Sequence, residues 1–418
     1  MKAELLTIGN ELLIGHTVNT NAAYLGRALA SVGVLVRRAV TVGDERDEIV
    51  AALEEAWRRA DVLVTTGGLG PTHDDITKKA VAEFCGVELE SHPEIMQKVR
   101  EAFARRNMEM PAPNEDQAWL PKGAILIDNP IGTAVGFHFR RDGKHCFVLP
   151  GVPSEMRHMT DAYVVPTLRE FSGGLVFRRR VLRTTGIAES ALYELLGEPR
   201  EVESRGVKVA FLPQFAGVDI ALSVGPLDAA TAEKLLDEAE AWFRQRVGRW
   251  IYGRDDQKLE EVVAELFFKT GKTVATAESC TGGLLANRLT DVSGSSNYFD
   301  RGVVTYSNTS KMQILGVREE TLARHGAVSE QTAREMAEGV RRISGTDFGV
   351  STTGIAGPTG GTPEKPVGLV YIGFAGPDGS YVEKHQFRKD RLENKFRATQ
   401  AALAVLWREL GKIVREKR

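Results

Sequence analysis

Three side chains in the C-terminal third of the chain have the chemistry to cleave an acyl bond. Ser279 lies in the segment AESCTGG, which follows an apolar stretch and is expected to open a helix, and Tyr306 and Lys311 follow further on. A serine hydroxyl becomes a nucleophile when a neighbouring group accepts its proton, and a lysine or tyrosine of lowered pKa can do so. These residue types indicate acyl transfer, with Ser279 as nucleophile and Tyr306 and Lys311 as proton-transfer groups.

Each of these residues also has a purely structural interpretation. Ser279 could be the N-cap of its helix, Tyr306 a residue at the edge of the core and Lys311 a surface lysine. Cys280 is a rival nucleophile because a thiol is intrinsically more reactive than a hydroxyl. A cysteine mechanism needs a positioned histidine, however, and only His325 is near in sequence. We therefore expect Ser279 rather than Cys280 to carry the reaction.

Glycine-rich segments beside these residues are suited to a phosphorylated ligand. A helix that begins after Ser279 would present backbone N–H groups to an oxyanion or a phosphate. The loop TTGIAGPTGG follows another apolar stretch, but it matches neither the Walker A pattern nor the dinucleotide fingerprint. Two arginines at the start of the last helix could pair with a phosphate, and we favour Arg391. The expected substrate-binding residues are Thr281, Gly282, Gly283, Thr353, Gly354, Ala356, Gly357, Arg391 and Arg397.

A second set of polar residues lies in the N-terminal third. The segments GNELLIG and NTN follow the first apolar stretch, and TTGGLGPTHDD ends the third. Glycine N–H groups suit a phosphate and carboxylates suit a divalent cation, although Asp74 and Asp75 could simply begin a helix and Glu155 could cap one. The expected substrate-binding residues of this region are Asn21, Gly67, Gly68 and Gly70. The expected metal ligands are Glu11, Asp74, Asp75 and Glu155, with Asp74 and Asp75 also taking part in catalysis.

The elements that must position the N-terminal residues follow from the hydrophobic pattern of residues 1–171. Short apolar runs occupy 4–8, 34–42, 61–65, 124–127 and 146–149. Amphipathic stretches lie between them at 21–31, 46–59, 77–85 and 94–106, and a helix over 153–171 closes the region. This alternation predicts an α/β domain with a doubly wound, parallel sheet covered on both faces. Ligands of such sheets bind beyond the carboxyl ends of the strands.

Two further regions follow a break in composition at Ser172-Gly173-Gly174. Residues 175–250 predict a small α+β module with strands at 207–212 and 218–224 and a helix at 229–247, and residues 250–256 are expected to be a linker. Residues 258–418 predict a second α/β domain. Its expected strands are 273–277, 302–306, 348–352 and 369–374, and its expected helices are 259–269, one from residue 280, 330–343 and 392–410.

Composition restricts the class of protein. The 418 residues exceed one ordinary core, and 42% hydrophobic with 26% charged residues is typical of a soluble globular protein. The net charge of −2 gives no general attraction to nucleic acid or membrane. Three widely spaced cysteines suit a reducing compartment and lack zinc-binding spacing. With no signal peptide or long apolar run in the sequence, we expect a cytoplasmic protein without a membrane partner.

The C-terminal motifs carry a family resemblance. AESCTGG, GVVTYSN followed by Lys311, HGAVSE and GIAGPTGGTPEKPVG together resemble the nicotinamide-mononucleotide amidase family, PncC, across residues 258–410. The resemblance implies hydrolysis of nicotinamide mononucleotide to nicotinate mononucleotide and ammonia, without a cofactor. By motif, Ser279 would be the nucleophile and Tyr306 and Lys311 would shuttle its proton. Backbone amides near Ser279 would hold the oxyanion, and residues 354–357 would hold the ribose-phosphate end.

The N-terminal motifs extend this resemblance to the full chain. TTGGLGPTHDD resembles the molybdopterin-binding fold, and with GNELLIG, NTNAAYLG, LPGVPSEM and the amidase motifs it is similar to the CinA family of competence/damage-inducible proteins. This resemblance implies an N-terminal ADP-ribose pyrophosphatase, which forms AMP and ribose 5-phosphate and uses a divalent cation, magnesium or a transition metal. It also implies a homodimer. A requirement for a monovalent cation stays open.

The middle module resembles the KH-type domain of the same family. A KH domain that binds nucleic acid needs a GXXG loop, and residues 175–250 contain no such sequence. The module is therefore expected to be a spacer or a dimer contact. The leading hypothesis is a bifunctional enzyme of pyridine-nucleotide recycling, with one activity in the N-terminal domain and the other in the C-terminal domain. The alternatives are an N-terminal domain that binds or adenylylates molybdopterin, and a protein that acts with nucleic acid in competence or DNA damage.

Overall fold

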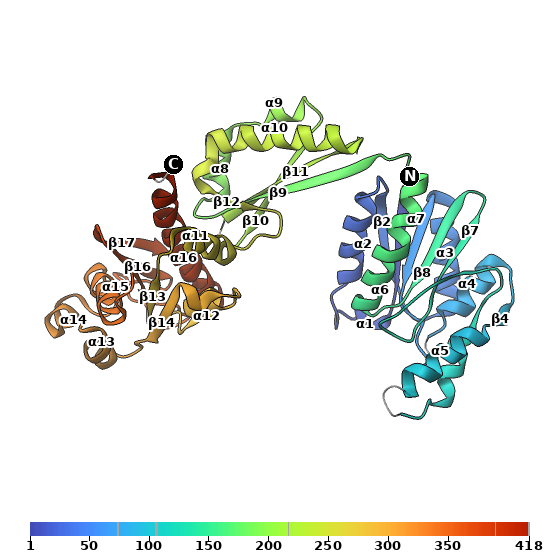
Figure 1. Ribbon diagram of the computed structural model, residues 1–418, viewed down its shortest axis with the longest axis horizontal. Helices are drawn as coiled ribbons and strands as arrows, with labels where there is room; N and C mark the ends of the chain where they lie inside the picture. The colour runs from blue at the N-terminus through green and yellow to red at the C-terminus, as the bar shows by residue number, and fades with distance from the viewer. Residues whose placement is uncertain (73–74, 105–107, 216, 389, 417–418) are drawn as a thin grey trace. The chain divides into compact units, whose positions relative to one another are not determined.

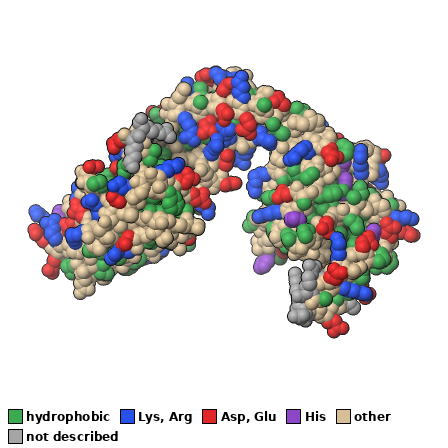
Figure 2. Space-filling model, in the orientation of Figure 1, with side chains coloured by type: hydrophobic (Ala, Val, Ile, Leu, Met, Phe, Trp, Pro, Cys, Tyr) green, Lys and Arg blue, Asp and Glu red, His purple; other side chains and the backbone are tan. Residues whose placement is uncertain are grey.

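The computed structural model describes residues 1–72, 75–104, 108–215, 217–388 and 390–416 (Figure 1). The chain forms two compact units, which are Met1–Arg178 with Ser223–Leu235, and Arg179–Leu222 with Leu236–Arg418. Within the described residues, no helix is long and apolar enough to cross a membrane. Basic and acidic side chains are intermingled on the face shown in Figure 2, in keeping with the near-neutral net charge.

A six-stranded sheet of order β2-β1-β3-β8-β7-β6 forms the centre of the first unit. Its strands are β1 Lys2–Ile8, β2 Leu35–Val42, β3 Val62–Thr66, β6 Ile125–Ile127, β7 Gly136–Arg141 and β8 Lys144–Leu149. The pairs β1–β2, β1–β3 and β3–β8 are parallel, whereas β7 and β6 are antiparallel. The predicted parallel sheet is correct for the first four strands. The unpredicted strand β7 joins β8 through Asp142 and Gly143, which both adopt positive φ in a hairpin turn.

Helices cover both faces of this sheet, as the alternation of residues 1–171 predicts. On one face lie α2 Thr20–Ala30, α6 Pro153–Met159 and α7 Val165–Phe171, with the π-helical segment η2 Thr160–Val164 between the last two. On the other lie α3 Arg46–Arg59, α4 Thr77–Cys85 and α5 Pro93–Ala104. Neighbouring strand residues divide between the faces, so Leu5 packs with α2 and Leu6 with α3. Shorter elements are α1 Asn10–Leu13, β4 Leu89–Ser91, η1 Ala112–Ala118 and β5 Trp119–Pro121.

The middle module contains a four-stranded sheet of order β10-β11-β9-β12. Its elements are β9 Val176–Thr184, α8 Glu189–Leu196, α9 Arg200–Glu203, β10 Lys208–Gln214, β11 Gly217–Leu227, α10 Ala229–Val247, η3 Gly248–Trp250 and β12 Ile251–Arg254. The predicted α+β module is confirmed, but the predicted linker over 250–256 is wrong. Strand β12 pairs with β9, because Ile251 and Tyr252 are apolar side chains that become buried.

The C-terminal domain has a five-stranded sheet of order β14-β13-β15-β16-β17. Its strands are β13 Val274–Glu278, β14 Phe299–Val304, β15 Phe348–Gly354, β16 Leu369–Gly376 and β17 Gly379–Gln386. Strands β14, β13 and β15 run parallel, and β16 and β17 are antiparallel. On one face pack α11 Leu259–Thr270, α12 Leu284–Thr290 and α16 Arg391–Glu416; α13 Asn308–Leu315, α14 Glu319–His325 and α15 Glu330–Ser344 complete the domain. The short segment η4 Ser295–Asn297 precedes β14.

Two boundaries in this domain differ from the prediction and change the candidate site. Helix α12 begins at Leu284 rather than at Cys280, so residues 279–283 form a turn. Strand β14 ends at Val304, so Tyr306 lies in the loop that leads to α13. The turn after β13 and the loop after β14 lie at the carboxyl ends of adjacent parallel strands, where α/β sheets place their ligands.

Candidate active site

Ser279 and Lys311 are in direct contact. The ammonium nitrogen of Lys311 lies 3.2 Å from Ser279 Oγ, and the backbone carbonyl oxygens of Thr305 and Tyr306 accept from the same nitrogen at 2.7 and 3.4 Å. A neutral lysine has two N–H donors and one lone pair. When the two carbonyls take the donors, the lone pair faces the Ser279 hydroxyl, so Lys311 is placed to remove its proton.

Burial lowers the pKa of Lys311 and so makes its amine a better proton acceptor. Its side chain is 1% exposed and lies beneath the loop that connects β14 to α13. Removal from water lowers the pKa of Lys311 from the ordinary lysine value, while the neighbouring Cys280 raises it to a smaller extent. Lys311 is thus not the surface lysine of the structural interpretation.

Tyr306 faces a different partner from the one predicted. Its side chain is 62% exposed, and its hydroxyl accepts a hydrogen bond at 3.2 Å from Arg391 at the start of α16. The other guanidinium nitrogen of Arg391 donates to the carbonyl oxygen of Gly357 at 2.8 Å. The structure therefore links Tyr306, Arg391 and the glycine-rich loop, and of the two predicted proton-transfer groups it places Lys311 against Ser279.

The turn between β13 and α12 is organised by Glu278, which the sequence did not single out. Its carboxylate is 1% exposed and accepts from the backbone N–H groups of Gly283, Leu285 and Ala286 at 2.8–3.0 Å. The N-cap of α12 is Gly283, so the interpretation of Ser279 as an N-cap is wrong. Glu278 also occupies N–H groups that were expected to face an oxyanion. In the described part of the turn, the amides of Cys280 and Thr281 have no backbone acceptor.

We expect Glu278→Gln to destabilise the C-terminal domain by about 1–3 kcal/mol. The glutamine side chain is uncharged, and its NH2 group would face the backbone N–H groups that the carboxylate now accepts from. Urea unfolding of the full chain, followed at the C-terminal transition, measures this change. Glu265→Gln is the matched control, since Glu265 is an exposed residue of α11 paired with Lys269. An unfolding midpoint for Glu278→Gln equal to that of the control would contradict the capping role.

The remaining residues of the turn and of the glycine-rich loop have mainly structural contacts. Thr281 is fully buried, and its hydroxyl shares a 2.6 Å hydrogen bond with that of Thr352. Gly282 and Gly283 both have positive φ, which suits glycine. Thr353, predicted to bind substrate, instead donates to the carbonyl oxygen of Ala327 at 2.7 Å. Its side chain therefore supports the loop before α15.

The loop after β15 is held from α16. A methyl group on Gly354 would lie 2.6 Å from the carbonyl oxygen of Leu369, so the neighbouring strand requires glycine there. Asn394 is 1% exposed and donates to the carbonyl oxygen of Ala356 at 2.9 Å. Gly357, with positive φ, presents its carbonyl oxygen to Arg391. Asn394 was not predicted, although it lies one turn after Arg391 on the same helix.

The structure separates the two candidate arginines. Arg397 forms an ion pair at 2.6 Å with Glu393 on its own helix, whereas Arg391 contacts both Tyr306 and Gly357. A second cation of α16 was missed in the sequence. The ammonium group of Lys395 would lie 3.6 Å from a methyl group on Gly282. The i, i+4 spacing of residues 391 and 395 on a helix was the signal for it.

Cys280 lacks the features of a catalytic thiol. Its side chain is 7% exposed, and burial raises its pKa to about 12, so the thiol stays protonated near neutral pH. Within the described residues, no histidine forms a hydrogen bond with it. The carbonyl oxygen of the nearest histidine in sequence, His325, accepts from Lys365.

In the N-terminal domain, the predicted substrate-binding residues are constrained by packing. Gly67 and Gly68 have positive φ, and a methyl group on Gly67 would lie 2.1 Å from the carbonyl oxygen of Ile8 in β1. The side chain of Asn21 donates to the carbonyl oxygen of Gly151 at 2.8 Å, and its own oxygen is buried with no hydrogen-bond partner in the described part of the chain. The contacts of Gly67 and Asn21 hold the loops after β3 and β8 against the end of β1 and the start of α2.

A large cavity opens next to the loop after β3. Its volume is about 930 Å³, and its lining includes Gly70, Asp75, Lys78, Lys79 and Asp116. Lys78, which was not predicted from the sequence, is 6% exposed, and burial lowers its pKa to about 8. The Lys78 amine donates to the carbonyl oxygen of Asp116 at 2.5 Å.

Three of the four predicted metal ligands lie among the described residues. Asp74 lies outside the described residues. Asp75 accepts from the backbone and hydroxyl of Thr72, and Glu155 accepts from the side chain of Asn129. Glu11 lies on α1. Across the described ranges, no three histidine, cysteine, aspartate or glutamate side chains are arranged to hold a metal ion.

The fold and these sites define a multidomain α/β protein with a lysine-paired serine in one domain and a glycine-lined cavity in another. Three family models match the chain in order. They are the probable molybdopterin binding domain over residues 4–170, the damage-inducible protein CinA KH domain over 179–253 and the CinA C-terminal domain over 256–410. The chain belongs to the CinA family.

Relatives in this family match the chain at full length. A CinA-like protein from Salinibacter ruber is 47% identical over 98% of this chain and 100% of the relative. A putative competence-damage inducible protein from Caldicellulosiruptor saccharolyticus is 47% identical over 97% of this chain and 98% of its own length. Among solved structures, the competence/damage inducible protein CihA from Agrobacterium tumefaciens is 44% identical and covers 37% of this chain and 95% of its own, with a TM-score of 0.35.

Proposed function

We propose that the C-terminal domain is a serine-dependent amidohydrolase that converts nicotinamide mononucleotide to nicotinate mononucleotide and ammonia. The observation that supports this proposal is the 3.2 Å contact between Ser279 Oγ and a lysine nitrogen that is almost fully buried. Exposed lysines are protonated at neutral pH and cannot accept a proton, whereas a buried one of lowered pKa can.

The proposed reaction has two halves. Ser279 Oγ attacks the carboxamide carbon and gives its proton to Lys311, and Lys311 passes this proton to the departing amine, which leaves as ammonia. Water then attacks the resulting ester, with Lys311 again accepting the proton. When the ester breaks, Ser279 regains a proton and the nicotinate product leaves. The oxyanion of each half-reaction is assigned to the amides of Cys280 and Thr281, because Glu278 occupies the amides of Gly283, Leu285 and Ala286.

The phosphate of the substrate is assigned to the cations of α16. Arg391 joins Tyr306 to the glycine-rich loop, and Lys395 lies beside Gly282 in the turn that carries Ser279, so each positive charge borders one of the loops of the candidate site. Arginine and lysine are the usual partners of phosphate groups. In this proposal Tyr306 positions Arg391, and Lys311 alone handles the proton of Ser279.

Incubation of the full chain with nicotinamide mononucleotide tests the proposal directly. Ammonia and nicotinate mononucleotide should appear in equal amounts, and free nicotinamide should not. Release of nicotinamide would instead indicate cleavage of the glycosidic bond and would reject the amidase assignment.

We also propose that the N-terminal domain hydrolyses ADP-ribose to AMP and ribose 5-phosphate. The cavity of about 930 Å³ beyond β3 supports this second function, because it is large enough for a dinucleotide-sized ligand and is lined by Lys78 and Lys79. The divalent cation stays a prediction that depends on Asp74, since the described carboxylates do not form a metal site. Binding of a molybdopterin would use the same cavity.

The expected result for this domain is AMP formation from ADP-ribose in the presence of Mg²⁺ or Mn²⁺, and its loss on addition of EDTA. Lys78→Met should lower the rate by about 10-fold or more, because it removes a buried cation beside the proposed diphosphate. Lys98→Met is the control, as Lys98 is an exposed residue of α5 that pairs with Asp128. An absence of AMP with every divalent metal would reject the pyrophosphatase and favour the pterin alternative.

A further inference from the structure

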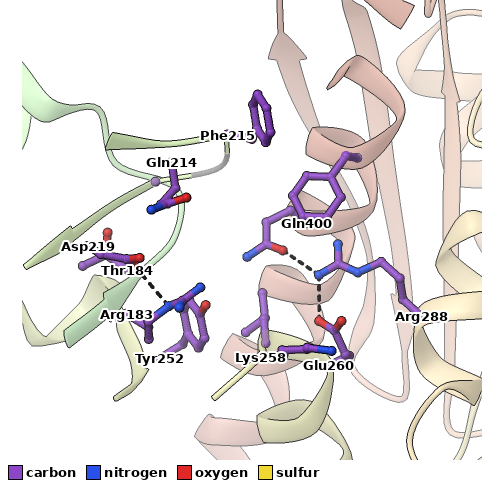
Figure 3. A pocket seen from close by; sticks show the side chains of 13 residues that line it. Arg183, Thr184, Gln214, Phe215, Asp219, Tyr252, Lys258, Glu260, Arg288 and Gln400 are labelled. Atoms are coloured by element: carbon purple, nitrogen blue, oxygen red, sulfur yellow. Dashed lines mark hydrogen bonds and ion pairs between the residues drawn. The ribbon is translucent and has the colours of Figure 1, made fainter. Parts of the chain in front are cut away.

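A second cavity lies within the unit that contains the C-terminal domain, away from Ser279. Its volume is about 360 Å³ (Figure 3). One wall comes from the end of β9 and the turn between β10 and β11, and the other from the start of α11, α12 and α16. Neither Ser279 nor Lys311 lines it. None of the functions considered above uses this cavity.

Charged side chains line this cavity with one positive charge in excess. Arg183 lies 3.2 Å from Asp219, and Arg288 lies 2.7 Å from Glu260, so two cations have acidic partners. Lys258, at the exposed start of α11, has no ion-pair partner among the described residues. The cavity therefore offers one unmatched cation beside two arginines.

Two arginine nitrogens of the lining are buried with no hydrogen-bond acceptor among the residues that the structure describes. Arg288 is 6% exposed, and its terminal nitrogens donate to Thr399, Gln400 and Glu260, but its Nε donates to no described group. The Nε of Arg183 is also unsatisfied, because its approach to Asp219 lacks hydrogen-bond geometry. Buried donors are nearly always paired in folded proteins, so two orphans in one lining indicate that an acceptor is missing.

Aromatic rings form the apolar part of the lining. Phe215 is 64% exposed at the turn between β10 and β11, and its ring lies 6.5 Å from that of Phe396 on α16, at an interplanar angle of 68°. The guanidinium of Arg288 lies 4.8 Å from the Phe396 ring on one side. Tyr252 of β12 is mostly buried nearby. Exposed phenylalanine is costly in water, and a planar heterocycle is the kind of group that stacks on such rings.

We propose that this cavity binds a mononucleotide, with the base against Phe215 and Phe396 and the phosphate near Lys258 and Arg183. A planar base matches the two rings, and a phosphate supplies the acceptor oxygens and negative charge that the lining lacks. The volume lies near the lower end for small-molecule sites, which favours one nucleotide over two. The site is independent of the activity proposed for Ser279.

The cavity shares two helices with the candidate active site. Helix α16 contributes Phe396 and Gln400 to the cavity and Arg391 and Asn394 to the glycine-rich loop. Helix α12 contributes Arg288 and begins directly after the turn that holds Ser279. A bound nucleotide would therefore contact the same rigid elements that position the catalytic turn.

Hydrogen–deuterium exchange of the full chain, with and without AMP, tests the proposal because it reports where the nucleotide binds. AMP should slow exchange in residues 211–220 and 255–262. Phe215→Ala and Lys258→Met should each weaken this protection, so that at least about tenfold more AMP is needed. Both side chains are exposed, so neither change threatens the fold. Lys269→Met is the control, because Lys269 is an exposed lysine of α11 outside the cavity.

The location of the protection separates this site from the others. Protection confined to residues 66–79 would place AMP in the N-terminal cavity, and protection confined to 279–283 and 354–358 would place it at Ser279. Either pattern would overturn the proposal, as would equal protection of residues 211–220 in wild type, Phe215→Ala and Lys258→Met.

Discussion

Ser279→Ala should abolish ammonia release from nicotinamide mononucleotide, with kcat lowered by at least about 10³-fold. The substitution removes the oxygen that forms the acyl bond. Cys280, the neighbouring candidate, is buried and its pKa is raised to about 12. Ammonia release at saturating substrate, measured with a coupled dehydrogenase, reports the effect.

Cys280→Ala is the matched control for this experiment. It should retain most of the wild-type rate, because the thiol side chain packs in the core and only the backbone amide is assigned to the reaction. The opposite pattern, in which Cys280→Ala is inactive and Ser279→Ala is active, would reject the serine mechanism. Equal activity of both variants would move the reaction to another site.

Lys311→Met should lower kcat by about 10²–10⁴-fold, because Ser279 then loses the base that accepts its proton. Methionine has a similar length without the amine, so it tests the nitrogen rather than the packing. The matched control is Lys395→Met. That variant should mainly raise KM, because Lys395 borders the proposed phosphate position and makes no contact with the Ser279 hydroxyl in the described structure.

The pH dependence of kcat/KM gives an independent test of Lys311. The protonated ammonium cannot accept a proton, so activity should be low below the pKa of Lys311 and should rise to a plateau above it. Because burial lowers that pKa, the rise should occur at lower pH than an ordinary lysine would give. Lys311→Met should lose this rise. A wild-type profile that is flat, or that falls with increasing pH, would exclude Lys311 as the base.

The parts of the fold with strong periodicity could be predicted from the sequence. Helices α3, α4 and α10 begin and end where the amphipathic pattern does, and the parallel strands appear as short apolar runs. Strands β7 and β17 could not be recognised in this way. Strand β17 is half polar because it lies at the edge of its sheet, and edge strands expose one side to water.

The contact between Ser279 and Lys311 could be anticipated, since both follow adjacent parallel strands and the carboxyl ends of such strands meet at one edge. The direction in which the Tyr306 side chain points could not be anticipated from the sequence. It lies two residues beyond β14, where the loop backbone rather than the strand sets the orientation of the side chain. Glu278 was not predicted. The pattern of apolar and polar residues along β13 does not indicate that the carboxylate of Glu278 turns toward α12.

The position of β12 affects where the chain can be cut to separate the middle module from the C-terminal domain. Residues 255–258, which follow β12, are held by hydrogen bonds. The Asp255 carboxylate accepts from the backbone N–H of Val181, and the side-chain oxygen of Gln257 accepts from the backbone N–H of Arg254. A protease that needs an extended, loose segment would find a poor substrate there. A truncated protein that starts at Lys258 would also lack Tyr252 of β12, which packs in the same core cluster as residues of α11 and α16, so that part of the C-terminal core would be exposed to water. Fragments intended for crystallisation or enzymology should therefore keep the middle module and the C-terminal domain together.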